Sequence, residues 1–281
     1  MKELLSPPKG LDLYQHQIDQ QINDVISQLG PPSRLREACE YALMSGGKRF
    51  RPALVLLIAN SLGAQNALPA ALAIEAFHTA SLIADDLPCM DNDTVRRNKP
   101  SVHIQFGETT ALLASYALIA AGYELLAKNA ALMGDPERGI VAVGITSKNT
   151  GLQGATGGQY DDIFPGELTK EVATDIIHKK TVTLFEIAFS YGWIFGGGDM
   201  EKLPLVKKAS EHFGLAFQIA DDMGDIEQDR LNGRDVNMCN LFGLEKAREM
   251  FHVELKGFES CFTGLGLDCG FLLSKIKSVK F

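Results

Sequence analysis

Apolar residues recur at helical spacing through most of this 281-residue chain. They fall at i, i+3, i+4 and i+7 in segment after segment, which favours α-helices. The pattern predicts helices over residues 11–28, 33–45, 52–62, 69–85, 101–128, 136–162, 170–195, 202–226 and 244–256, with a weaker helix over 268–280. No convincing strand-turn-strand pattern interrupts them, so we predict an all-α fold.

Glycine and proline clusters separate the predicted helices, and they bear on the number of domains. Residues 30–32 (Gly-Pro-Pro) end the first helix, and residues 134–136 (Gly-Asp-Pro) mark a later loop. Residues 196–198 (Gly-Gly-Gly) are the one plausible hinge, yet similar acidic clusters lie on both sides of it. We therefore expect a single all-α domain over residues 1–281.

The most apolar run, residues 111–127, contains Ser115, Tyr116 and Glu124. It falls short of the ~20 apolar residues that cross a bilayer. We expect a buried core helix there and no membrane span.

Composition and charge narrow the classes of partner and compartment. With 46% hydrophobic residues in 30.6 kDa, the chain can bury a sizeable core. A net charge of −8 and a pI of about 5.3 argue against a nucleic-acid partner. The five cysteines form no CxxC pair, and residues 1–10 show no signal peptide. We therefore expect reduced thiols in a cytoplasmic protein.

A first acidic cluster follows an apolar helical run, residues 72–83. Asp85, Asp86 and Asp91 lie there, just ahead of an arginine pair at 96–97. Carboxylates at the end of a buried helix are costly unless a cation neutralises them. Hard oxygen ligands of this kind suit Mg²⁺, which takes a few carboxylates together with phosphate oxygens.

A second cluster has the same arrangement, an apolar helical run followed by aspartates. Asp221, Asp222 and Asp225 follow the apolar run 213–220, and Gln218 lies one turn earlier. At helical spacing, Asp225 shares a face with each of the other two, and like charges so placed repel. A single cluster of this kind is more often a solvated face. Two of them on separate apolar helices favour a metal site.

Four further stretches carry candidate chemistry, each with a plainer alternative. Residues 46–52 place three cations beside two glycines, which suits a phosphate, or a helix end whose dipole the cations complement. His78 lies two turns before the first cluster and is equally compatible with a core position. Residues 156–162 are a possible cavity wall or a close helix crossing. Lys179-Lys180-Thr181 could simply be solvated.

The ordered set of motifs resembles the trans-polyprenyl diphosphate synthases. That family has the same order and spacing of residues 46–52, the Asp85-Asp86-x4-Asp91 cluster with Arg96-Arg97, Lys180-Thr181, and Phe217-Gln218-x2-Asp221-Asp222-x2-Asp225. The resemblance covers roughly residues 35–250, and the string 85–93 is similar to bacterial and plastid geranylgeranyl diphosphate synthases. It implies about ten antiparallel helices around a deep central cavity, usually in a homodimer.

The resemblance also implies head-to-tail condensation of isopentenyl diphosphate onto an allylic diphosphate (dimethylallyl, geranyl or farnesyl). Ionising the allylic C–O bond leaves diphosphate, whose charge cations must stabilise. The implied ligands of two or three Mg²⁺ ions are Asp85, Asp86, Asp91, Asp221, Asp222 and Asp225. Arg96 and Lys180 would pair with the allylic diphosphate, and Lys48, Arg51, His78 and Arg97 would bind isopentenyl diphosphate. Thr181 and Gln218 would present oxygen dipoles to the carbocation, and the released diphosphate would take the proton.

The chain departs from the family pattern at three places. Asn98 stands where glycine is usual, and Ala84 where histidine is common. Residues 231–243 contain no lysine, whereas the family usually has lysines there that close over the diphosphate; Arg230 and Arg234 are candidate substitutes. A class I terpene cyclase would have no use for residues 46–52 with His78 and Arg97. A catalytically silent partner subunit would normally have lost one acidic cluster, and a helical scaffold explains none of the charges.

The helix before Asp85 is expected to set product length, because residues at i−4, i−5 and i−8 line one face. Farnesyl-specific bacterial relatives usually carry an aromatic residue at the fifth position upstream, where this chain has Ala80 next to Ser81. Phe77 lies one turn further from the cluster, where its ring is large enough to close the cavity. We expect geranylgeranyl diphosphate as the main product, with farnesyl diphosphate, or a weak subunit of a heteromeric synthase, as alternatives.

Overall fold

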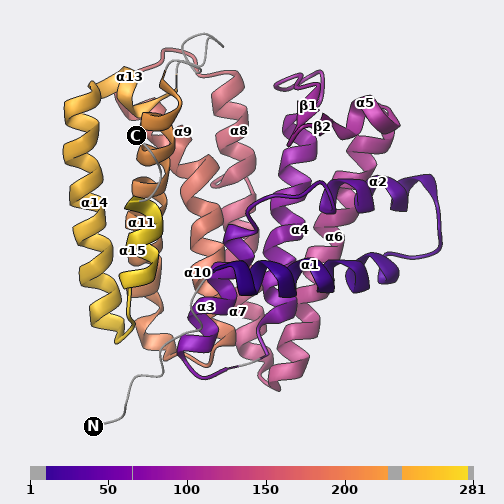
Figure 1. Cartoon of the computed structure of the whole chain (residues 1–281), viewed down its shortest axis with the longest axis horizontal. Helices are drawn as coiled ribbons and strands as arrows, with labels where there is room; N and C mark the ends of the chain where they lie inside the picture. Colours follow the sequence, from indigo (N-terminus) through magenta and orange to yellow (C-terminus); the bar gives the residue numbers. More distant parts are fainter. Residues whose placement is uncertain (1–10, 65, 227–235, 278–281) are drawn as a thin grey trace. The chain divides into compact units, whose positions relative to one another are not determined.

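A computed structural model describes residues 11–64, 66–226 and 236–277. Within these residues the chain is helical apart from one short hairpin (Figure 1), so the all-α prediction is confirmed. The chain forms two compact units. The N-terminal unit comprises residues up to Val143 with Tyr191–Gly198, and the C-terminal unit comprises Gly144–Ser190 with the residues from Asp199 onward. The single domain over 1–281 and its central cavity stay predictions.

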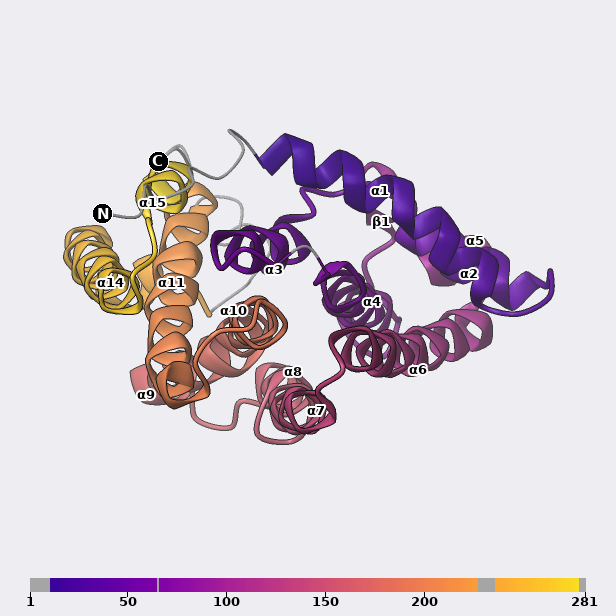
Figure 2. The ribbon, with the colours of Figure 1, turned by 90° about the horizontal axis from the view of Figure 1, so that it is seen from below.

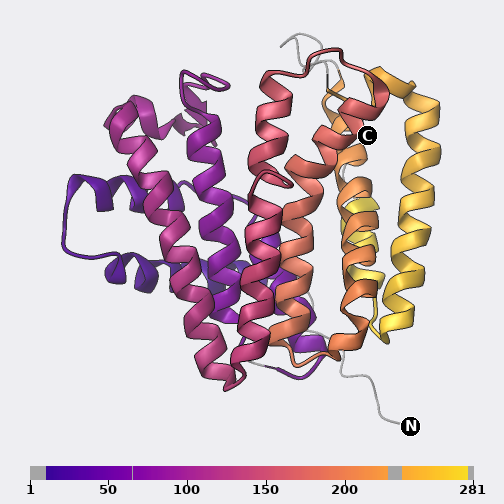
Figure 3. The same ribbon diagram turned by 180° about the vertical axis from the view of Figure 1, so that it is seen from behind.

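The N-terminal unit is arranged around α4 (Leu68–Asp85). Pro69 lies in its first turn, and apolar residues cover nearly all of its sides. α4 packs against α3 (Phe50–Ser61) and α6 (Glu108–Met133), and Figures 2 and 3 show α6 alongside it. A helix with several neighbours is apolar all round rather than along one stripe. The unit also contains α1 (Leu11–Gln28), α2 (Arg34–Leu43), β1 (Val95–Arg96), β2 (Lys99–Pro100), α5 (Val102–Phe106) and the first part of α7 (Pro136–Thr150).

One face of α6 packs against α4 and α2, whereas the other is exposed. The exposed face carries Leu112, Leu113, Tyr116 and Ile119, which are 39%, 46%, 59% and 40% exposed. The expectation of a buried core helix therefore holds for one face only. By length and composition alone, α6 could cross a membrane, although such a helix is weak evidence for a span. The absence of a span stays a prediction.

Aromatic packing holds the C-terminal unit together. Phe185 and Phe189 of α10 (Thr183–Phe195) meet Phe213 of α11 (Leu203–Gly224), and Phe213 meets Phe258 of α14 (Leu244–Leu265). Edge-to-face packing of such rings adds to the hydrophobic gain from burying them. The unit also contains α8 (Ala155–Ile163), α9 (Lys170–Ile177), the π-helical turn η1 (His178–Val182), the 3₁₀ turn η2 (Met200–Lys202), α13 (Met238–Phe242) and α15 (Gly270–Lys277).

Two long predicted helices are interrupted by glycine. The helix predicted over 101–128 divides into α5 and α6 at Gly107, whose φ of 88° an L side chain rarely adopts. The helix predicted over 136–162 divides into α7 and α8 across residues 151–154. The hairpin and α13 were not predicted, because elements of two to five residues are too short to show a hydrophobic period.

Candidate active site

The first acidic cluster lies where α4 ends, in the N-terminal unit. Asp85 is the last residue of α4 and is half-buried, and Asp91 is exposed. The backbone N–H of Asp91 donates to the carbonyl of Asp85 at 2.9 Å, which folds the following loop back onto the helix end. Asp86 is different, because it is only 2% exposed.

The Asp86 carboxylate has a partner inside the protein. Arg96 donates to its Oδ1 from Nε at 2.9 Å and also from Nη2, and the same Nη2 donates to Asp93 at 3.0 Å. Burial raises the pKa of Asp86, and the bond to Arg96 opposes that rise. Arg96, predicted to bind the allylic diphosphate, thus already ties β1 to the end of α4.

The hairpin turn explains one departure from the family pattern. β1 and β2 are antiparallel, with Arg96 opposite Lys99, and Arg97 and Asn98 form the turn at φ 54° and 62°. A two-residue turn with both φ angles positive is of type I′, which favours asparagine or glycine. Asn98 therefore fits the place where glycine is usual. Arg97 is a costlier residue for this conformation.

Arg97 reaches back to the glycine pair at 46–47. Its Nη1 donates to the carbonyl of Gly46, and a Cβ at Gly47 would lie 2.5 Å from the Arg97 guanidinium carbon. Gly47 also has a φ of 124°, so both its conformation and this close approach require glycine. α2 ends at Leu43, whose carbonyl accepts a hydrogen bond from Arg49, so one of the cations of this stretch does bind the end of that helix.

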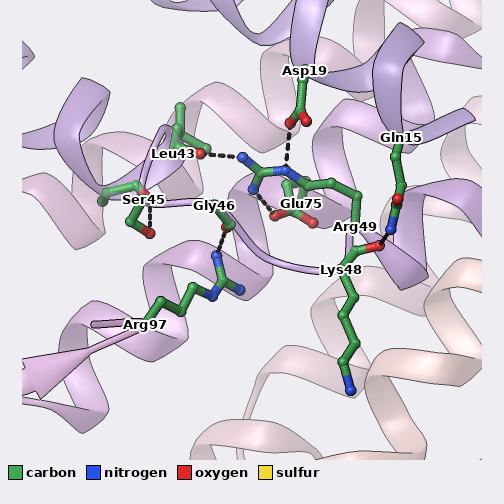
Figure 4. A network of polar contacts seen from close by, with 10 residues as sticks. Gln15, Asp19, Leu43, Ser45, Gly46, Lys48, Arg49, Glu75 and Arg97 are labelled. Carbon is green, nitrogen blue, oxygen red and sulfur yellow. Dashed lines mark hydrogen bonds and ion pairs between the residues drawn. The ribbon is translucent and has the colours of Figure 1, made fainter. Parts of the chain in front are cut away.

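His78 lies at the centre of a group of arginines. Burial lowers the pKa of His78 well below its usual value, and Arg51, Arg97, Arg49 and Arg96 lower that pKa further. Among the residues that the structure describes, its buried Nδ1 has no hydrogen-bond partner. The structure thus brings Arg51, His78 and Arg97, three of the four predicted isopentenyl diphosphate ligands, into one cationic cluster. The fourth, Lys48, is exposed, and its ammonium points away from Arg49 (Figure 4).

The second acidic cluster lies at the end of α11 in the C-terminal unit. Asp221 and Asp225 are exposed, whereas Asp222 is 3% exposed. α11 ends at Gly224, so Asp225 caps the helix, and its N–H donates to the carbonyl of Asp221 at 3.1 Å. The helix therefore ends one residue before Asp225, and the prediction that Asp225 continues its helical spacing is wrong by one residue.

A chain of hydrogen bonds runs through Asp222. Thr181 donates from Oγ1 to Oε1 of Gln218 at 2.8 Å, and Gln218 donates from Nε2 to Oδ1 of Asp222 at 2.7 Å. The N–H of Met238 donates to Oδ2 of Asp222 at 2.7 Å. Three predicted site residues are thus connected to each other and to the start of α13. The lysine-free segment preceding it, residues 231–235, and Arg230 lie outside the described residues.

Lys180 and Thr181 lie on the π-helical turn η1. Such turns are rare and frequently mark functional sites. Lys180 pairs with Asp162, and Lys179 pairs with Asp161 and Asp175 at 2.8 and 2.6 Å. α8 crosses η1 at Gly158, where a Cβ would lie 2.6 Å from that of Lys179. Residues 156–162 therefore include a close helix crossing, the simpler of the two readings.

The donor sets of the acidic clusters fit a metal that is bound by protein carboxylates and by a substrate phosphate together. Within the described ranges, no group of three or more histidine, cysteine, aspartate or glutamate side chains could hold a metal ion by itself. Mg²⁺ usually binds through one or two carboxylates together with substrate phosphates and water. Asp91, Asp221 and Asp225 offer exposed carboxylates, and Asp85 offers a half-buried one. Asp86 and Asp222 already accept hydrogen bonds inside the protein, so they would have to share their carboxylate oxygens between these partners and a metal.

The predicted product-length residues lie where α4 meets α6. The Phe77 ring packs edge-on against Tyr123, with centroids 5.2 Å apart, and a Cβ at Gly122 would lie 2.6 Å from it. The carbonyl of Ala80 accepts a bond from Ser115 of α6 at 3.0 Å. Ser81 is half-buried and donates to the carbonyl of His78 at 2.9 Å. Their role in product length stays a prediction.

Sequence reasoning missed the residues that support the cationic cluster: Gln15, Asp19, Arg49 and Glu75. Glu75 carried a usable signal, because it is the one charged residue in the apolar run 72–83. Such a charge, when buried, needs an opposite charge nearby. Gln15 and Asp19 gave no signal, since polar residues are ordinary on an amphipathic helix.

Comparison with known proteins gives a consistent result. The polyprenyl synthetase family model matches residues 32–236. A chloroplastic geranylgeranyl pyrophosphate synthase 7 of Arabidopsis thaliana is 37% identical over 86% of this chain and 76% of its own length. A chloroplastic heterodimeric geranylgeranyl pyrophosphate synthase large subunit 1 of the same plant is 36% identical over 87% of this chain and 72% of its own length.

Solved structures agree in fold. The FPP/GFPP synthase of Zymomonas mobilis has a TM-score of 0.83 at 31% identity, covering 96% of this chain and 99% of that one. A geranyltranstransferase of Thermotoga maritima has a TM-score of 0.79 at 31% identity, covering 96% and 97%. The resemblance drawn from the ordered motifs is confirmed.

The expectation of a cytoplasmic protein is wrong. The similar plant proteins are chloroplastic, and another relative, geranylgeranyl pyrophosphate synthase 10 of Arabidopsis thaliana, is mitochondrial. Five free cysteines indicate a reducing compartment but do not say which one.

The lowered pKa of His78 predicts a pH-dependent stability. Because the folded state holds this ring neutral, the unfolded state binds the proton more readily, and the free energy of unfolding rises with pH. The contribution is fully present above the unfolded pKa of about 6.5 and is lost as the pH falls toward the folded value. We expect His78→Gln to weaken the loss of stability between pH 7.5 and 5, measured by urea unfolding. His252→Gln, at an exposed position on α14, is the control. Equal slopes for wild type and His78→Gln would contradict the burial of a neutral ring.

Proposed function

Because the chain belongs to the polyprenyl synthetase family, we propose that it condenses isopentenyl diphosphate head-to-tail with an allylic diphosphate, with geranylgeranyl diphosphate as the main product. The observation that carries the proposal is the cationic cluster of Arg51 on α3, Arg97 of the hairpin turn and His78 on α4, the helix whose end bears Asp85 and Asp86. The similar proteins named geranylgeranyl pyrophosphate synthase support the product.

The cluster suits a diphosphate because the positive charge of Arg97 is incompletely compensated. Burial lowers the pKa of Arg97, as do Arg49 and Arg96, and Glu75 opposes this only in part. A diphosphate would supply the missing negative charge, and two guanidinium groups could bind its oxygens in pairs. Neutral His78 could donate one N–H to the same group, and exposed Lys48 could close over it. We assign isopentenyl diphosphate to this site.

The carboxylates at the two helix ends suit the allylic partner. Bound Mg²⁺ would supply Lewis-acid stabilisation of the departing diphosphate. Asp85 and Asp91 would offer ligands for such ions in the N-terminal unit, and Asp221 and Asp225 would offer them in the C-terminal unit. Asp86 and Asp222 would keep these ends in place, unless they exchange their internal partners for the metal. Arg96 and Lys180, with side chains 32% and 27% exposed, could share their charge between their carboxylate partners and the allylic diphosphate.

The hydrogen-bond chain in the C-terminal unit orients the oxygens that would face the carbocation. The Thr181 hydroxyl donates its proton to Gln218, which leaves lone pairs on the threonine oxygen. The amide of Gln218 is fixed by its donation to Asp222. No side-chain base is needed, because the released diphosphate can accept the proton. Both acidic clusters are present, which supports an active enzyme over a silent subunit.

A second copy of the chain is the proposed partner of the exposed α6 face. Leu112, Leu113, Tyr116 and Ile119 recur at i, i+3 and i+4 spacing, the pattern of a face that packs on a neighbour. Monomeric proteins rarely expose extended apolar patches. We propose a homodimer through this face; the relative named as a heterodimeric large subunit makes a different partner chain the alternative.

The reaction is tested by incubating the protein with isopentenyl diphosphate, Mg²⁺ and each allylic diphosphate, followed by product sizing. We expect Asp85→Ala and Asp221→Ala to reduce kcat by about two to three orders of magnitude, because each removes stabilisation of developing charge. Both variants should fold, since removing clustered like charges relieves repulsion. Glu259→Ala, on the exposed surface of α14, is the control. Near-normal turnover of both aspartate variants would sink the two-cluster mechanism.

Product length tests whether the side chains at positions 80 and 77 of α4 limit the length of the substrate cavity. Ala80→Tyr should shorten the main product to fifteen carbons, because its ring fills the first turn below the cluster. Phe77→Ala should lengthen the product past twenty carbons, and it should cost about 3–5 kcal/mol of stability by leaving a cavity against Gly122. Chromatography of the dephosphorylated products measures the length, and thermal unfolding measures the stability. A wild type that stops at fifteen carbons, with no effect of Phe77→Ala, would favour the farnesyl diphosphate alternative.

The dimer is tested by light scattering after size exclusion. We expect the wild type to run as a dimer and Leu113→Lys with Tyr116→Glu to shift it toward monomer, because both place charges in an apolar contact. Val253→Glu, at an exposed position on α14, should leave the mass unchanged. A monomeric wild type would refute the homodimer.

A further inference from the structure

Arg49 is a buried cation with no place in the proposed reaction. It is 3% exposed. In the chain it lies between Lys48 and Arg51, which do have a place in that reaction. Its backbone adopts the left-handed conformation at φ 45° and ψ 36°, at the N-terminal end of α3. That conformation is unfavourable for an L residue, because it brings the Cβ atom too close to the following carbonyl oxygen. A strained backbone persists only where its surroundings fix it, so the contacts of Arg49 show what is being fixed.

The Arg49 guanidinium is satisfied on three sides within the N-terminal unit (Figure 4). Nε donates to Asp19 of α1 at 2.8 Å, Nη1 donates to Glu75 of α4 at 2.5 Å, and Nη2 donates to the carbonyl of Leu43 at the end of α2. Glu75 is 2% exposed, so this ion pair is buried. With two carboxylates on it, the charge of Arg49 is already compensated, and it is not a ligand for an anion.

The same loop is held at two further points. Gln15 of α1 donates to the carbonyl of Lys48, and Arg97 of the hairpin turn donates to the carbonyl of Gly46. Both bonds go to the backbone, so the side chain of Lys48 remains available. Figure 4 shows the Lys48 side chain leaving the loop on the side away from Asp19 and Glu75. The loop between α2 and α3 is thus tied to α1, α4 and the hairpin together.

We propose that Arg49, with Asp19 and Gln15 of α1, positions the loop that binds isopentenyl diphosphate, so that α1 sets the affinity for this substrate without touching it. The inference rests on the proposed function, which assigns Lys48 and Arg51 to that diphosphate. A planar guanidinium with three fixed acceptors determines the orientation of the backbone on either side of it. A buried ion pair contributes little net stability, which argues for a geometric role.

Asp19→Asn separates positioning from simple electrostatics, because the two predict opposite signs. Removing a negative charge near a cationic site strengthens diphosphate binding by Coulomb's law. Loosening the loop weakens it. Asp24→Asn is the matched control, since it makes the same charge change at an exposed position of the same helix. We expect Asp19→Asn to raise KM for isopentenyl diphosphate, and its Kd by calorimetry, roughly tenfold, which corresponds to about 1.4 kcal/mol. KM for the allylic diphosphate and kcat should change less than about twofold on the same scale.

Two further variants complete the test. Gln15→Ala removes the bond to the Lys48 carbonyl without any charge change and should also raise KM for isopentenyl diphosphate alone. Arg49→Lys keeps the charge but loses the fork, and it should raise this KM as well if it folds. A KM for isopentenyl diphosphate that falls or stays unchanged in both Asp19→Asn and Gln15→Ala would overturn the inference while leaving an active wild type. A wild type without turnover would instead refute the proposed function.

Discussion

A charge buried inside these apolar helices has to meet an opposite charge or hydrogen-bond donors within the protein, and this constraint shapes the site. Glu75 lies among the apolar residues of α4 and forms an ion pair with Arg49. Arg49 makes this contact with its backbone in the left-handed conformation, which L residues disfavour. The loop between α2 and α3 takes its path from that pair. Lys48 on this loop and Arg51 in the first turn of α3 flank Arg49, so a buried contact determines where one exposed and one half-buried cation lie.

The two acidic pairs follow the same rule in both units. Neighbouring residues on a helix differ by about 100° in direction, so two adjacent aspartates cannot face the same side. In each pair the second member points inward: Asp86 is held by Arg96, and Asp222 by Gln218 and the N–H of Met238. The first members, Asp85 and Asp221, stay more exposed. One aspartate of each pair thus fixes the helix end, and the other is the one that we propose to bind the metal.

The sequence was sufficient for what depends on local pattern. The helical period predicted most elements, and the ordered motifs identified the residues of both acidic clusters and the cations around His78. It could not show which aspartate of a pair turns inward, because both are the same residue type at adjacent positions between apolar residues. The contact of Asp19 with Arg49 links positions 30 residues apart, and no period in α1 predicts it. The compartment was missed for another reason: free cysteines indicate a reducing environment, and several compartments provide one.

Strain and charge meet at a single place in the N-terminal unit. Arg49 and Arg97 both adopt positive φ, at 45° and 54°. The Arg97 guanidinium lies against Gly47, where a Cβ atom would clash with it. Each strained residue brings a guanidinium to the same loop, one from inside and one from the hairpin. Arg49 is neutralised by Asp19 and Glu75, whereas the pKa of Arg97 is lowered by burial and by neighbouring arginines. The unit thus compensates the charge of Arg49, which holds the loop, and compensates that of Arg97 only in part; the diphosphate that we propose to bind there would supply the missing negative charge.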